Sequence, residues 1–159
     1  MKLYTAGYGR WPVATRIDRL IDALKKAGVS LLIDARHSPC ASQMDPKSHY
    51  GPHDWNLQAG AKGIAAHLRR AGIDYRWLVE LGNPQKNDRK MAVLKEQLAS
   101  GDEQWPVNRG LALLATILRE GRPCALLCAC ADWRKCHRTV IAEAIRTRYP
   151  KLGIEVEHV

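Results

Sequence analysis

Short apolar runs alternate with amphipathic stretches along the chain. The apolar runs predict five strands, at 2–6, 30–34, 74–78, 123–128 and 154–158. Apolar residues at intervals of three, four and seven predict five helices, over 15–27, 61–71, 89–99, 107–119 and 136–148. Strands that alternate with helices are typical of a three-layer αβα sandwich with a mostly parallel sheet. We therefore expect a Rossmann-like α/β fold of about five strands, with its working site at their carboxyl ends.

A single domain over residues 1–159 is the simplest organisation. The chain has 159 residues, of which 46% are hydrophobic, and a chain of this size buries a sufficient core without disulfides. We find no internal repeat and no Ser/Gly linker. A long irregular loop at about 35–58, rich in Pro, His, Ser and Gly, interrupts the pattern. Loops of this length in compact domains are usually functional or mobile.

Charge and hydropathy restrict the partners. No apolar run approaches the ~20 residues needed to cross a bilayer, and the first residues lack the apolar core of a signal peptide. We therefore expect a cytoplasmic protein with no membrane partner. Lys and Arg total 25 against 16 acids, a formal charge of +9, which favours an anionic small molecule or nucleic acid as partner. The charges are spread along the chain, so the small anionic ligand is the stronger expectation.

Cysteines gather near the C-terminus, where four of the five fall within Cys124–Cys136. Such clustering in a chain of this kind indicates catalysis or metal binding. In the first interpretation, the start of a helix favours an anion and lowers the pKa of Cys136. Arg36 and Arg138 then hold the anion, and the Cys136 thiolate or His137, as acid or base, supplies the chemistry. The protein would be an enzyme of unknown reaction.

In the second interpretation the same segment holds zinc or iron. Thiolate and imidazole ligands suit both metals, and the candidate ligands are Cys128, Cys130, Cys136 and His137. Their spacing is not that of a standard zinc finger. Cys136 and His137 are neighbours at the start of a predicted helix, and neighbouring side chains project in different directions from a helix. We therefore do not expect all four candidates to bind one ion together. Cys124 is expected to be a packing residue.

Two further segments carry candidate site residues. Asp34 and Arg36 follow the second predicted strand and leave it on the same side. Asp34 is the third candidate catalytic residue, orienting a reaction partner, although the two residues could simply pair with each other. Gly7 and Tyr8 lie at the first strand–helix turn, where glycine permits close backbone approach, and are candidate ligand-binding residues.

Taken together, these residues resemble the family called domain of unknown function 488. The similar segments are Leu3-Tyr4-Thr5-Ala6-Gly7-Tyr8, the D-x-R-x-x-P stretch from Asp34 to Pro39, Leu81-Gly82 and the closing Cys128-Ala129-Cys130…Cys136-His137-Arg138. Relatives usually carry an acid two residues after the first cysteine, where this chain has Cys130. The resemblance implies an αβα fold and a shared pocket, and it implies no reaction.

Three hypotheses about function follow from the sequence. The leading one is a small enzyme that binds an anionic, phosphate-bearing ligand, a nucleotide or a nucleic-acid component. The alternatives are a zinc- or iron-binding protein with Cys/His ligands and a nucleic-acid-binding module without catalysis. The oligomeric state, the reaction and the identity of any cofactor stay open at this point.

Overall fold

A single sheet of five parallel strands forms the centre of the molecule. The computed structural model describes residues 1–37, 63–83, 85, 88 and 90–159. Its strands are β1 (Lys2–Gly7), β2 (Leu31–Asp34), β3 (Asp74–Trp77), β4 (Cys124–Cys128) and β5 (Glu155–His158). Their order in the sheet is β3-β2-β4-β1-β5, and every neighbouring pair is parallel. The predicted sheet is confirmed, with nearly the predicted bounds for each strand.

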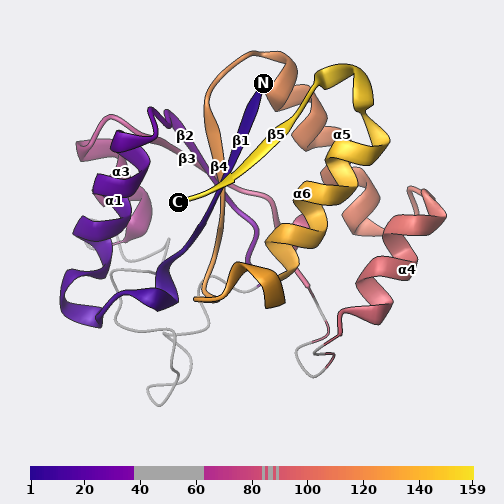
Figure 1. Cartoon of the computed structure of the whole chain (residues 1–159), viewed down its shortest axis with the longest axis horizontal. Helices are drawn as coiled ribbons and strands as arrows, with labels where there is room; N and C mark the ends of the chain where they lie inside the picture. Colours follow the sequence, from indigo (N-terminus) through magenta and orange to yellow (C-terminus); the bar gives the residue numbers. More distant parts are fainter. Residues whose placement is uncertain (38–62, 84, 86–87, 89) are drawn as a thin grey trace.

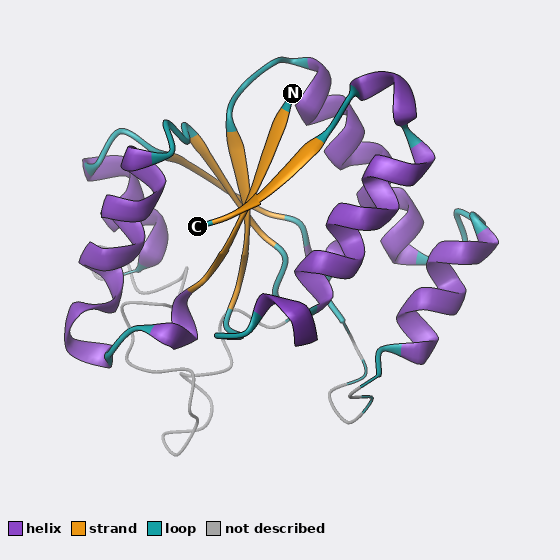
Figure 2. Ribbon diagram, in the orientation of Figure 1, coloured by secondary structure: helices purple, strands orange, loops and turns teal. Residues whose placement is uncertain are grey.

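Helices cover both faces of this sheet, which confirms the three-layer αβα architecture (Figure 1, Figure 2). One face carries α1 (Arg16–Lys26) and α3 (Ile64–Arg70). The other carries α4 (Ala92–Ser100), α5 (Pro106–Arg119) and α6 (His137–Arg148). Within the described part of the chain, none of the helices has the length and apolar character that crossing a membrane requires.

Two local predictions had mixed outcomes. A helix was predicted over 89–99, and Asp88 Oδ2 accepts a hydrogen bond from the Val93 N–H at 3.1 Å. That helix nevertheless begins later, at Ala92. Of the predicted loop at 35–58, residues 35–37 lack helix and strand, and 38–58 lie outside the described residues.

The alternation of side chains along each strand divides the core into two halves. Leu126 of β4 and Ile33 of β2 pack in the cluster shared with α4, α5 and α6. Leu127 and Leu32 pack in the cluster shared with α1 and α3. Successive side chains of a strand point to opposite faces, so Cys128 faces α6, whereas Asp34 faces α1. The side chains of Cys128 and Asp34, the last residues of these two strands, therefore lie on opposite faces of the sheet.

Candidate functional site

Three cysteine sulfurs and one histidine nitrogen converge where β4 ends and α6 begins. The Sγ atoms of Cys128, Cys130 and Cys136 all lie within 4.8 Å of one another. Cys128 Sγ is 3.7 Å from Cys130 Sγ and 3.6 Å from Nδ1 of His137. The same Nδ1 is 3.8 Å from Cys136 Sγ. The three predicted cysteine ligands therefore lie together, and the fourth candidate, His137, contacts the sulfurs of Cys128 and Cys136.

The convergence corrects the expectation that Cys136 and His137 project apart. Cys136 is not a helical residue but the N-cap of α6, with extended backbone at φ −119° and ψ 142°. His137 is the first residue of the helix. Because the backbone changes conformation between them, both side chains reach Cys128.

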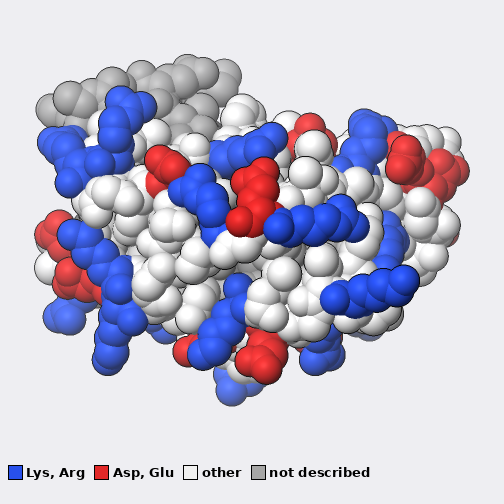
Figure 3. Space-filling model, turned by 90° about the horizontal axis from the view of Figure 1, so that it is seen from above, with Lys and Arg blue, Asp and Glu red and all other residues white. Residues whose placement is uncertain are grey.

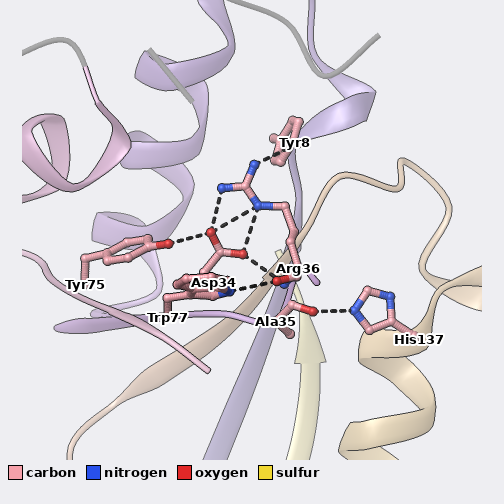
Figure 4. A network of polar contacts seen from close by, with 7 residues as sticks. All are labelled: Tyr8, Asp34, Ala35, Arg36, Tyr75, Trp77 and His137. Carbon is pink, nitrogen blue, oxygen red and sulfur yellow. Dashed lines mark hydrogen bonds and ion pairs between the residues drawn. The ribbon is translucent and has the colours of Figure 1, made fainter. Parts of the chain in front are cut away.

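The imidazole of His137 is oriented by the backbone of the other candidate segment. Its Nε2 lies 2.7 Å from the carbonyl oxygen of Ala35 (Figure 4). A carbonyl only accepts, so Nε2 carries a proton, and Nδ1 is the ring nitrogen that faces the sulfurs. This hydrogen bond joins the backbone of the Asp34–Arg36 segment to the start of α6.

Two glycines let the cysteine loop cross the end of β1. The Gly9 N–H donates to the Ala129 oxygen at 2.9 Å. A Cβ at Gly9 would lie 2.3 Å from that oxygen, and a Cβ at Gly7 would lie 2.1 Å from the Cys130 oxygen. No side chain fits at such distances. The close approach predicted at Gly7 is therefore made by this chain's own loop, and a ligand-binding role for Gly7 and Tyr8 stays a prediction.

An aromatic stack fixes the middle of the loop. The Trp133 ring lies parallel to the His158 ring of β5, with centroids 3.8 Å apart. His158 Nδ1 lies 2.7 Å from Thr5 Oγ1, and the Thr139 hydroxyl donates to the Trp133 oxygen at 2.6 Å. The loop is thus tied to β1, β5 and α6.

Arg138 lies beneath the same loop. Its side chain is 2% exposed, and its Nη1 donates to the Cys130 oxygen at 2.8 Å. It brings a positive charge close to the cysteine sulfurs. Its predicted role in holding an anion stays a prediction.

A second buried network surrounds Asp34 on the opposite face of the sheet (Figure 4). The Arg36 Nε donates to both carboxylate oxygens of Asp34, at 2.9 and 3.1 Å, and its Nη2 donates to Oδ2 at 2.6 Å. Arg36 Nη1 donates to the Tyr8 hydroxyl at 3.1 Å. The Tyr75 hydroxyl donates to Asp34 Oδ2 at 2.6 Å, and Trp77 Nε1 donates to the Arg36 oxygen at 2.8 Å.

This network confirms the pairing of Asp34 with Arg36. The two side chains are 0% and 4% exposed, so the ion pair is buried. Burial raises the pKa of Tyr8 to about 12, although the Arg36 guanidinium opposes the shift. The catalytic role of Asp34 and the anion-binding role of Arg36 stay predictions, and the structure gives both side chains protein partners.

The charge of the sulfur cluster is concentrated on Cys128. Hydrogen bonds from Cys130 and Cys136 stabilise the Cys128 thiolate and lower its pKa, although burial opposes this. The same hydrogen bond raises the pKa of Cys130 to about 11, and bonds to Cys128 and Cys130 raise that of Cys136. The raised pKa of Cys136 is opposite to the direction expected at the start of a helix.

His137 responds to the same charge. Its burial disfavours the imidazolium, but the Cys128 thiolate outweighs burial and the pKa of His137 is raised. Cys124, by contrast, is a core residue whose burial raises its thiol pKa to about 11. Its predicted packing role agrees with its 0% exposure.

A groove of about 620 Å³ opens beside the sulfur cluster. Its lining residues are Asn83, Asp88, Lys90, Met91, Lys95, Cys130, Arg134, Lys135 and His137. Sequence reasoning missed the four cations of this set. Arg134 and Lys135 had a local signal, since they precede Cys136, but Lys90 and Lys95 reach the groove only through the tertiary fold.

Basic side chains also occur away from this groove. The edge at which the strands begin, seen in Figure 3, carries Lys and Arg side chains with Asp and Glu side chains between them. The overall positive charge therefore does not by itself identify a site. The case for an anionic ligand depends on the cations that line the groove.

One family model matches the chain, that of the Domain of unknown function DUF488, over residues 52–145. The matched region contains Cys128, Cys130, Cys136, His137 and Arg138. No curated protein matches the chain, and no solved structure does. Because the matched region spans more than half of the 159 residues, the chain belongs to the DUF488 family, as its motifs implied.

Proposed function

We propose that this protein binds one zinc ion through Cys128, Cys130, Cys136 and His137. One observation carries the proposal: three sulfurs lie within 4.8 Å of one another, and Nδ1 of His137 lies beside two of them. Zinc bonds of about 2.3 Å to sulfur and about 2.0–2.1 Å to nitrogen, in a tetrahedron, set the donors roughly 3.5–3.8 Å apart. Three of the six donor–donor distances match this range: 3.7 Å between the sulfurs of Cys128 and Cys130, and 3.6 and 3.8 Å from Nδ1 to the sulfurs of Cys128 and Cys136.

The surroundings of the donor atoms support the same proposal. Zinc-bound histidines usually donate their other ring N–H to a carbonyl or carboxylate, which fixes the tautomer. His137 has this arrangement with Ala35. Three thiolates and a neutral imidazole around Zn²⁺ leave one negative charge, and the buried Arg138 guanidinium beside Cys130 offsets it.

The donor set favours a single zinc ion over an iron–sulfur cluster. Three cysteines and one histidine are a common ligand set of structural zinc sites. The sulfurs lie within 4.8 Å of one another, close enough for one ion, whereas ligands on two iron atoms would stand farther apart. Four protein donors complete a tetrahedron, so the ion would hold the loop from Cys128 to His137 in place. Enzymatic activity and nucleic-acid binding stay predictions.

Elemental analysis of protein purified without chelators tests the proposal. We expect about one zinc ion per chain, and about one also in Cys124→Ala, which removes a cysteine outside the cluster. Metal-free protein whose thiols all react freely would overturn the proposal. Stoichiometric iron would overturn the assignment of zinc.

A further inference from the structure

We infer that the groove beside the sulfur cluster binds a small phosphate-bearing anion, and that zinc holds one of its walls in place. The second part of this inference rests on the proposed function. Among the described residues, four cations line the groove, Lys90, Lys95, Arg134 and Lys135, against one acid, Asp88. Asp88 is already engaged, since its Oδ2 accepts the Val93 N–H. The groove therefore has a positive potential.

The cations come from two separate parts of the chain. Arg134 and Lys135 belong to the loop between β4 and α6, whereas Lys90 and Lys95 belong to α4 and the residues before it. Like charges that line one groove repel each other. An anion bound among them removes that repulsion and gains hydrogen bonds from both walls.

Arg134 is held over the loop rather than by a strong ion pair. Its guanidinium stacks on the Trp133 ring, 4.5 Å from the centroid. Its nearest carboxylate oxygen, on Asp132, is 3.8 Å away, and the Arg134 side chain is 70% exposed. Its donors are therefore available to a ligand.

A phosphorylated small molecule matches both the charge and the size of the groove. Arg presents a planar fork of donors and Lys a point charge, and both are common phosphate ligands. A volume of about 620 Å³ falls within the range of small-molecule sites. It exceeds what a bare phosphate fills, so a phosphorylated small molecule is the ligand class.

Zinc would fix the position of the loop between β4 and α6, which forms one wall of this groove. Arg134 and Lys135 lie between two proposed ligands, Cys130 and Cys136. An ion that joins these ligands closes the loop and reduces the number of conformations open to the two cations. Removing zinc should therefore weaken the binding of the anion.

Calorimetric titration of zinc-loaded protein with adenosine 5′-monophosphate tests the inference, with adenosine as the uncharged comparison. We expect the monophosphate to bind and adenosine not to bind. Lys135→Glu and Lys95→Glu, one on each wall, should each weaken binding by at least about tenfold, since each replaces a charge-assisted hydrogen bond by repulsion. Metal-free protein should also bind more weakly.

Arg146→Glu is the matched control. Arg146 lies in α6, pairs with Glu143 and is 55% exposed, and it does not line the groove. The same charge reversal there should leave binding unchanged. If Arg146→Glu loses as much affinity for the monophosphate as the two lysine variants, the groove site is overturned. The same follows if the monophosphate does not bind to protein that contains zinc. Either result leaves the zinc proposal standing. If protein purified without chelators contains no zinc but still binds the monophosphate through Lys95 and Lys135, the groove site is supported and the metal centre is overturned.

Discussion

Replacing Cys136 with alanine is expected to weaken zinc binding by on the order of 100-fold. Structural zinc sites with four ligands have binding free energies of about 10–16 kcal/mol, so one ligand corresponds to roughly 3 kcal/mol and about two orders of magnitude in affinity. The Cys136 sulfur lies 3.8 Å from His137 Nδ1 and within 4.8 Å of the other two sulfurs. Competition with a chromophoric zinc chelator measures the change.

Cys124→Ala is the control for this substitution. Cys124 and Cys136 are 0% and 1% exposed, so each variant removes one buried sulfur atom and leaves a similar small cavity. Cys124 lies in β4 and is not part of the sulfur cluster. Its variant should keep the zinc affinity of the original chain. If both variants bind zinc as tightly as the original chain, Cys136 is not a ligand.

Replacing Asp34 with asparagine is expected to lower the free energy of unfolding by about 3–5 kcal/mol, the usual cost of leaving one buried charge without its partner. Asp34 accepts from Arg36 and Tyr75, and Arg36 is 4% exposed. The neutral amide cannot compensate the guanidinium, and water does not reach it. Urea denaturation followed by circular dichroism measures the difference.

Asp74→Asn provides the comparison at the surface. Asp74 Oδ2 lies 2.6 Å from Arg122 Nη2, as short as the Asp34–Arg36 contact, but these side chains are 69% and 38% exposed. Water screens this pair, so its loss should cost at most about 1 kcal/mol. If the two variants lose similar amounts of unfolding free energy, burial does not determine the cost of removing the carboxylate. That result would contradict the interpretation of the Asp34 network.

The fold was predictable because its signals are local. Leu31 to Asp34 form an apolar run, and Ile17, Leu20 and Leu24 recur at helical spacing. Each pattern needs only neighbours in the sequence. The bounds of helices and strands consequently shift little between sequence and structure, apart from the starts of α3 and α4, which lie at Ile64 and Ala92 rather than at 61 and 89.

The site was predictable only in part, because it depends on tertiary contacts. The four proposed ligands could be named from their residue types. Their approach to one another depends on the extended backbone at Cys136 and on the passage of the loop over Gly7. The helix-dipole argument failed at Cys136 because it ignored the sulfurs that the loop brings near. Tyr75 reaches Asp34 through the pairing of β3 with β2, which no local pattern indicates.

X-ray absorption spectroscopy at the zinc K edge tests the central claim most directly, because it reports the atoms bound to the metal. The four-ligand centre predicts three sulfur neighbours at about 2.3 Å and one nitrogen at about 2.0–2.1 Å. A first shell made only of nitrogen and oxygen would contradict a centre built from Cys128, Cys130, Cys136 and His137.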